Sequence, residues 1–180
     1  MVKVRLYLVR HGKTMFNTIG RAQGWSDTPL TAEGERGIQE LGIGLRESGL
    51  QFERAYSSDS GRTIQTMGII LEELGLQGKI PYRMDKRIRE WCFGSFDGAY
   101  DGDLFMGIIP RIFNVDHVHQ LSYAELAEGL VEVDTAGWAE GWEKLSGRIK
   151  EGFEAIAKEM EEQGGGNALV VSHGMTIGTI

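Results

Sequence analysis

Two histidines lie at the ends of predicted β-strands, and each is followed by a glycine. Arg10-His11-Gly12 follows an alternating apolar segment at residues 2–9, and Ser172-His173-Gly174 follows the apolar segment 168–171. A neutral imidazole nitrogen can attack phosphorus, and an adjacent arginine guanidinium can bind two phosphate oxygens at once. The first motif alone is equally consistent with an ordinary polar strand end, because function has to be inferred from a whole site.

Two further segments carry residues with the same kind of chemistry. Residues 56–66 contain a predicted strand end, a polar turn and a helix start that bears Arg62, where an arginine can join backbone N–H groups in binding an anion. Residues 89–98 place Glu90 among aromatic residues, where burial can raise the carboxyl pKa and make it a general acid. Each segment by itself is also consistent with a charged residue on the surface.

Together the four segments resemble the histidine phosphatase superfamily, also called the phosphoglycerate mutase-like family. Their order and separations agree with the family over about residues 4–177, nearly the whole chain. Further matching positions are Thr14, Asn17, Gln23-Gly24-Trp25, the Ser57-Ser58-Asp59 turn and Asp97-Gly98. With the stretch that begins at Gln23 as the fifth, these elements match in the correct order. The set is far more specific than any one of them.

The resemblance implies a role for each matched residue. His11 would be the nucleophile that becomes phosphohistidine, and Glu90 would donate a proton to the leaving oxygen and then activate water. The phosphoryl group would be held by Arg10, Asn17, Arg62 and the second catalytic histidine, His173. Substrate would contact Thr14, Gln23 and Gly24, and the family implies no metal and no other cofactor.

The elements between these residues predict an α/β fold. Strands at residues 2–9, 54–57, 79–83 and 168–171 alternate with helices, which indicates a three-layer sandwich with a mostly parallel sheet. Ligands bind at the carboxyl ends of the strands in such sheets, so we expect His11 and His173 to meet at one edge.

The helices are predicted from capping residues and apolar spacing. One should begin after Thr31 and end at Gly49, and another should run from Asp59 or Ser60 to Gly75. The clearest has an apolar stripe from Trp138 through Trp142 to Met160, which places both tryptophans in the core. Residues 12–30 are predicted to be loop, and residues 95–137 a small lid with up to two short helices.

Length and charge favour one enzyme domain over residues 1–180. The chain has 26 acidic and 19 basic residues and a net charge of −7, which argues against nucleic-acid or membrane partners. A single cysteine, no secretory leader and no apolar run of 18 residues lead us to expect a soluble cytoplasmic protein acting on a small phosphorylated metabolite. Family members continue beyond the position of Ile180, so we expect further residues there, and a sheet edge left open would favour a homodimer.

Four other functions were compared with a phosphatase. A phosphoglycerate mutase needs more cations than one phosphoryl pocket supplies, but Arg111 is the only basic residue from Phe93 to Gly141, among nine acidic ones. A P-loop is rejected because Tyr7 stands where the motif needs glycine. Asp116-His117-Val118-His119 could chelate a metal, but a polar lid segment is the preferred interpretation. A phospho-ligand binding module with little turnover stays open.

Overall fold

Four parallel strands form the centre of the computed structural model, which describes residues 2–180. The order is β1 (Val4–Arg10), β4 (Gly166–Ser172), β2 (Arg54–Ser57) and β3 (Tyr82–Met84). The register aligns Val4 with Gly166 and Arg10 with Ser172. Both His-Gly motifs therefore follow the carboxyl ends of neighbouring strands, at the same end of the sheet, as predicted. β1 lies at one side of the sheet, and its pairing with a second copy stays a prediction.

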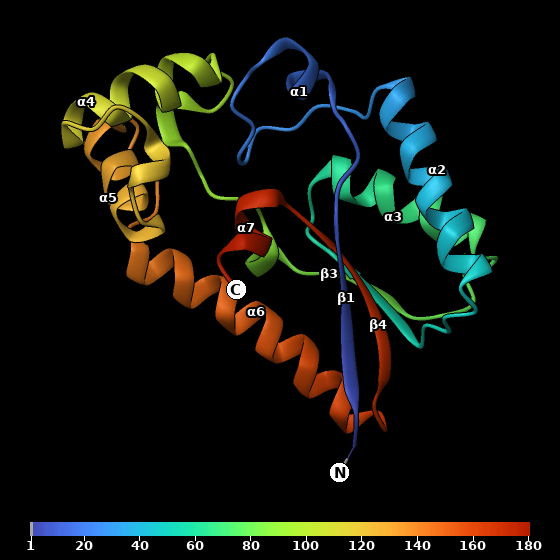
Figure 1. Ribbon diagram of the computed structural model, residues 1–180. Helices are drawn as coiled ribbons and strands as arrows, with labels where there is room; N and C mark the ends of the chain where they lie inside the picture. Colours follow the sequence, from blue (N-terminus) through green and yellow to red (C-terminus); the bar gives the residue numbers. More distant parts are fainter. Residues whose placement is uncertain (1) are drawn as a thin grey trace.

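Helices cover both faces of the sheet, which confirms the three-layer α/β sandwich (Figure 1). Residues on one face, including Leu169 and Val171, pack with α2 (Ala32–Glu47) and α3 (Gly61–Glu73) in one core cluster. Residues on the other face belong to a second cluster with α6 (Trp142–Glu162). None of the helices among residues 2–180 is long and apolar enough to cross a membrane.

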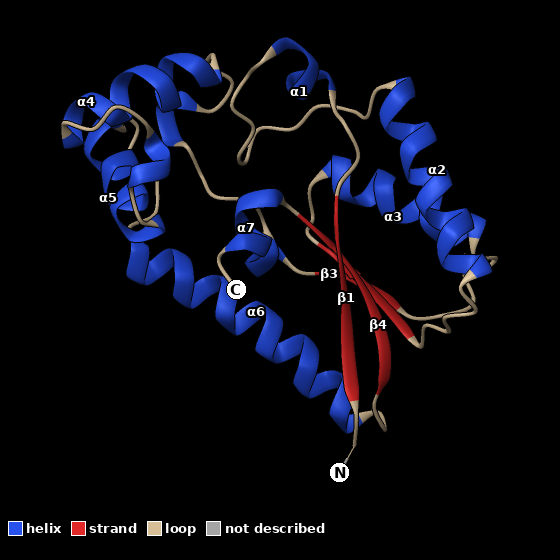
Figure 2. Ribbon diagram, in the orientation of Figure 1, coloured by secondary structure: helices blue, strands red, loops and turns tan. Residues whose placement is uncertain are grey.

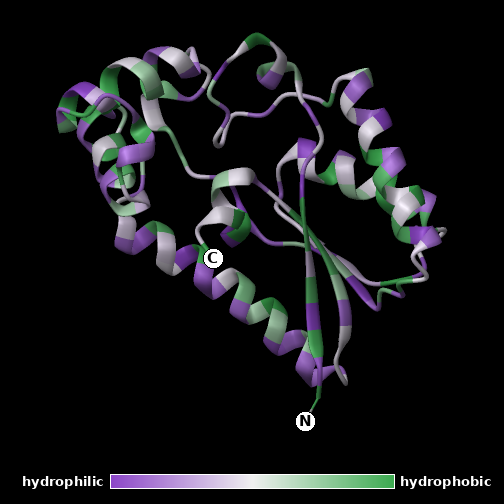
Figure 3. Ribbon diagram, viewed as in Figure 1, coloured by the Kyte–Doolittle hydropathy of each residue, from purple (hydrophilic) through white to green (hydrophobic). Residues whose placement is uncertain are grey.

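α6 buries the apolar stripe expected from its sequence, and Figure 3 shows polar and apolar residues alternating along it. The buried side chains are Leu145, Ile149, Phe153, Ile156 and Met160. They lie on one side because their spacing of three and four residues follows the helical turn. The same core cluster continues into the lid through Leu104, Ile109, Leu126 and Leu130.

The predicted start of this helix was wrong. Trp138 lies before α6 and is 63% exposed. The Asp134 carboxylate accepts hydrogen bonds from the backbone N–H groups of Ala136, Trp138 and Ala139, at 2.6–2.8 Å, which curls this segment into a turn. Gly137 has a φ of 71°, a left-handed conformation that interrupts a helix.

A short helix, α1 (Met15–Ile19), lies within the segment predicted to be loop. Its start is fixed by a capping box, in which the Thr14 side chain and the Asn17 side chain each bond to the other's backbone N–H. Gly20 ends it in a left-handed conformation, with a φ of 65°. Five residues are too few for an apolar stripe, so hydropathy gave no signal.

The lid rises beyond the carboxyl ends of the strands, as Figure 1 shows. A π-helical segment at Asp103–Ile108 leads into α4 (Ile109–Phe113), and α5 (Tyr123–Val133) follows. The last helix, α7 (Gly174–Gly178), begins directly after His173.

An ion pair between Arg148 of α6 and Glu140 joins the chain just after the lid to residues 87–90. Arg148 contacts both carboxylate oxygens of Glu140, with a shortest distance of 2.6 Å. It also donates to the backbone carbonyls of Arg87, Arg89 and Glu90, at 2.8–3.3 Å. The side chains of Arg148 and Glu140 are largely buried, at 14% and 3% exposed, so water is mostly excluded from these bonds.

We expect Arg148→Met to lower the free energy of unfolding by about 3 kcal/mol, because it leaves the Glu140 charge buried without a partner. Urea denaturation measures this loss. The matched control is Lys150→Met on the same helix, whose partner Glu154 is exposed, and it should cost less than about 1 kcal/mol. Equal losses in the two variants would contradict the assignment.

Candidate active site

A cleft of about 370 Å³ lies at the carboxyl ends of β1 and β4. Five of the residues predicted from sequence line it, together with Gly174 and Met175 from the start of α7 and Asp101, Phe105 and Tyr123 from the lid. The five are Arg10, His11, Asn17, Gln23 and Glu90. The cleft therefore lies where the end of β1, the loop after it, the segment that carries Glu90 and the start of α7 meet.

His11 is a buried histidine, only 9% exposed. Its Nδ1 lies 2.8 Å from the Gly12 carbonyl, which requires an N–H there and leaves Nε2 with a free electron pair. Burial lowers the pKa of His11 from 6.5 to about 4, and the charges of Arg62 and Arg10 act in the same direction. The imidazole is therefore neutral and nucleophilic at neutral pH.

Arg62 is fully buried behind this cleft at the start of α3. One terminal nitrogen donates to the Asp27 carboxylate and to the Ser26 carbonyl, each at 2.8 Å, and the other donates to the Gly24 carbonyl at 2.7 Å. Its Nε is buried and has no partner among the residues that the structure describes. That leaves one donor of a charged group unused.

His173 lies next to both groups. Its ring centre is 5.3 Å from that of His11, and its Nδ1 is 3.0 Å from a terminal nitrogen of Arg62. Because arginine only donates, Nδ1 accepts, and Nε2 then carries the proton toward the Ser58 hydroxyl at 2.7 Å. Burial lowers the pKa of His173 further below its ordinary value, and Arg62 adds to the effect. With both nitrogens bonded to protein groups, its predicted contact with phosphate stays a prediction.

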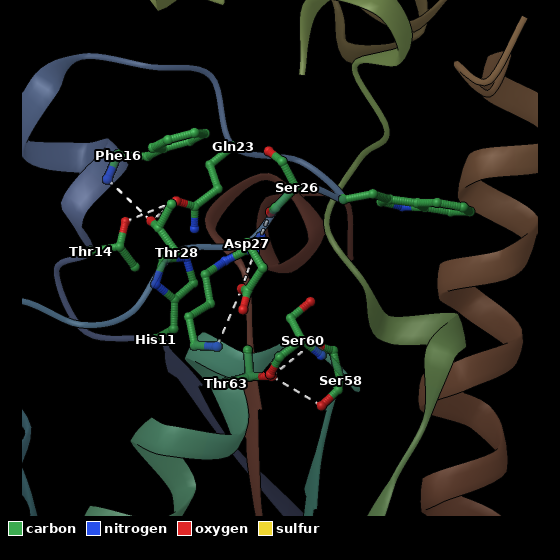
Figure 4. A network of polar contacts seen from close by, with 12 residues as sticks. His11, Thr14, Phe16, Gln23, Ser26, Asp27, Thr28, Ser58, Ser60 and Thr63 are labelled. Carbon is green, nitrogen blue, oxygen red and sulfur yellow. Dashed lines mark hydrogen bonds and ion pairs between the residues drawn. The ribbon is translucent and has the colours of Figure 1, made fainter. Parts of the chain in front are cut away.

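Thr14, Gln23 and Thr28 form a polar cluster beside His11, which Figure 4 shows. The Gln23 Oε1 lies 3.0 Å from the Thr14 hydroxyl and 2.7 Å from the Thr28 hydroxyl. Its amide Nε2 is buried and has no partner among the residues described, which leaves a donor for an anion. The Asn17 Oδ1 accepts from Thr14, so its amide nitrogen is also free to donate.

Two predicted substrate contacts lie behind the cleft instead of lining it. Thr14 is fully buried and orients Asn17 and Gln23. Gly24 is buried as well, and a Cβ there would lie 2.3 Å from the Trp91 carbonyl. Both positions shape the cleft through neighbouring residues.

Asp97 holds the Gly24 loop in place, although the sequence indicated no role for it. Its carboxylate accepts from the backbone N–H groups of Gly24, Ser26 and Phe93, at 2.9–3.0 Å, and from the Ser26 hydroxyl at 2.6 Å. One carboxylate therefore joins residues 23–26, here called the substrate loop because the resemblance places substrate contacts there, to the segment that carries Glu90. Its place in the matched Asp97-Gly98 pair was the only signal.

Glu90 is buried in the cleft wall, beside the start of α7. Its Oε1 accepts from the backbone N–H groups of Trp91 and Thr176, both at 3.0 Å, and its Oε2 accepts from Met175 N–H at 3.2 Å. Burial raises the pKa of the Glu90 carboxyl, while these hydrogen bonds and Arg62 oppose the rise. A protonated Glu90 can donate to a leaving oxygen.

Arg21 is a cation of the cleft that the sequence analysis did not assign. It donates to the Gly98 carbonyl at 2.6 Å and lies 4.4 Å above the Tyr100 ring. It follows the left-handed Gly20 that ends α1, in a segment predicted to be loop, so no spacing in the sequence pointed to it. Arg10 is exposed, and its guanidinium passes so close to Gly174 that a Cβ there would lie 3.3 Å from Nε.

Metal ligands are not grouped in this cleft or elsewhere in the described chain. Among residues 2–180, no three His, Cys, Asp or Glu side chains come close enough together to hold an ion. His117 is exposed and precedes a 3₁₀ turn at Val118–Gln120, and His119 within this turn lines a cavity formed by lid residues.

Comparison with known proteins agrees with this geometry. The family model of the histidine phosphatase superfamily (branch 1) matches residues 6–180. The probable phosphoglycerate mutase GpmB of Salmonella choleraesuis is 32% identical over 179 residues, 98% of this chain and 73% of that protein.

Two solved structures show the same fold. The phosphoglycerate mutase from Bacillus anthracis has a TM-score of 0.91 and 38% identity, covering 99% of this chain and 78% of that one. The alpha-ribazole phosphatase from Shigella flexneri has a TM-score of 0.67 and 24% identity, covering 96% of this chain and 75% of that one. With the family model matching nearly its whole length, this chain belongs to the histidine phosphatase superfamily.

Proposed function

We propose that this protein hydrolyses small phosphomonoesters through a phosphohistidine on His11, without a metal ion. The observation that carries the proposal is the pairing of a neutral, buried imidazole with a buried carboxyl in one cleft. A nucleophile has to be deprotonated and a general acid protonated at the same pH, and burial favours both states here.

The reaction would have two steps. In the first, Nε2 of His11 attacks phosphorus, the bond from phosphorus to the ester oxygen breaks, and Glu90 gives its proton to that oxygen. In the second, water loses a proton to Glu90 and attacks phosphorus, and the nitrogen–phosphorus bond breaks to release phosphate. The atoms and protons balance, and both residues return to their starting states.

The charge on the transferred group needs donors that are already in place. Arg10, Asn17 and Gln23 line the cleft, and the buried Gln23 Nε2 and Arg62 Nε have no partner among the residues that the structure describes. Phosphoryl oxygens bound there would satisfy donors that are otherwise buried without partners, which favours binding.

The lid favours a phosphatase over a mutase. Its lining residues in the cleft are one acid, Asp101, and two aromatic residues, Phe105 and Tyr123. A mutase intermediate carries a second phosphate, which needs cations where this lid places a carboxylate. The names of the Salmonella and Bacillus relatives keep phosphoglycerate mutase as the second candidate.

Incubation with 3-phosphoglycerate distinguishes these two reactions. We expect no conversion to the 2-phospho isomer and at most slow release of inorganic phosphate, because Asp101 in the cleft disfavours an anionic alcohol. Accumulation of 2-phosphoglycerate faster than phosphate would establish the mutase instead.

Hydrolysis of 4-nitrophenyl phosphate in the presence of a chelator tests the nucleophile. Wild type should release 4-nitrophenol, and His11→Ala should lose at least about 10³-fold, because it has no nitrogen to accept the phosphoryl group. His117→Ala, at an exposed lid residue that does not line the cleft, is the matched control and should retain full activity. Binding of phosphate without turnover in wild type would favour the binding module.

Glu90→Gln tests the general acid. In single-turnover measurements, release of the first alcohol should fall about 10²–10⁴-fold for an alkyl phosphate, whose alkoxide needs the proton. Release of 4-nitrophenol should change little, because this anion leaves without one. An equal loss with both esters would argue that Glu90 acts on something other than the leaving oxygen.

The His11 pKa of about 4 can be measured by NMR titration in phosphate-free buffer, with His11→Ala to assign the resonance. Below that pH the imidazole is protonated, so the acid limb of kcat/KM should fall there and not near 6.5. Arg10→Gln removes a nearby positive charge and should raise the value. A midpoint near 6.5 in wild type would contradict the burial of the ring.

A further inference from the structure

A second cavity, of about 630 Å³, lies under the lid directly beside the reaction cleft. Asp101, Phe105, Tyr123 and Met175 line both spaces. The two spaces therefore adjoin along these four residues, so the lid cavity is the space next to a phosphoryl group bound at His11.

The lining of this lid cavity is mostly apolar. Its apolar side chains come from four parts of the chain, the π-helical segment, the 3₁₀ turn and its end, α5 and α7: Phe105, Met106, Val118, Leu121, Leu126 and Met175. Its ionisable residues are Asp101, His119 and Tyr123, and no Lys or Arg lines it among the residues that the structure describes. A carboxylate or second phosphate placed here would lose its water without gaining a cation.

Two large side chains at the cavity are unusually exposed for their type. Met106 is 79% exposed and Tyr123 is 41% exposed, whereas Leu104, Ile109 and Leu126 of the lid are buried. Apolar surface that gathers around a concave site indicates a ligand that covers it.

We propose that the substrate is the monoester of an apolar alcohol, alkyl or aryl, and that the lid cavity holds this alcohol while His11 takes the phosphoryl group. The proposal rests on the proposed function and adds the class of leaving group. Asp101 at the junction of the two spaces would disfavour anionic alcohols such as glycerate.

Alkylphosphonates test the cavity separately from hydrolysis, because their carbon–phosphorus bond is not cleaved in the proposed reaction. We would measure the binding of methyl-, butyl- and hexylphosphonate to wild type by calorimetry. Affinity should rise about two- to fourfold for each added methylene, the gain expected for moving it from water into an apolar site. Equal affinities along the series, or no binding at all, would overturn the proposal.

Met106→Glu places a charge at the cavity and should remove the dependence on chain length, while methylphosphonate binds as in wild type. Val131→Glu is the matched control, because Val131 is an exposed residue of α5 that does not line the cavity, and it should leave the series unchanged. If affinity still rises steeply with chain length in the Met106 variant, the alkyl chain binds elsewhere and the assignment is overturned. If wild type binds longer alkylphosphonates more tightly but hydrolyses no phosphomonoester, the result would count against the proposed function alone.

Discussion

The active site depends on one buried positive charge, the Arg62 guanidinium. Burying such a group costs several kcal/mol unless its N–H groups are bonded and its charge is balanced. Asp27 supplies the opposite charge, and the carbonyls of Gly24 and Ser26 take further N–H groups. These bonds hold the substrate loop against α3, and the contact with His173 fixes that ring in one tautomer. The remaining Nε has no partner among the residues that the structure describes.

The same desolvation acts in opposite directions on the two reacting groups. It lowers the pKa of His11 and raises the pKa of Glu90, because each loses water around its charged form. In the proposed mechanism the neutral imidazole is the nucleophile and the protonated carboxyl is the proton donor, and desolvation favours each of these forms. Burial supplies both reactive forms, and the charges of Arg62 and Arg10 reinforce the effect on the imidazole.

The sequence predicted the sheet, its layers and the convergence of His11 with His173, because hydrophobic periodicity and parallel topology are local or regular signals. It did not predict Arg148 or Asp97, whose bonds join segments about 60 and 70 residues apart, and no pattern marks such pairs. Trp138 was misplaced because the Asp134 turn overrides an apolar spacing that would otherwise continue the helix. The lid cavity could not be predicted, since it is formed by side chains from several short elements.

The carboxylate of Glu90 is bound by the first N–H groups of α7, and α7 continues from β4, which pairs with the strand that carries His11. Glu90 and His11, the proposed acid and nucleophile, are thus connected through strand hydrogen bonds and a few backbone amides, a path that bypasses α4 and α5. Changes in the lid sequence can therefore alter which alcohol is accepted while the separation between proton donor and nucleophile stays constant. Such an arrangement lets one reaction centre serve many substrates as lids diverge.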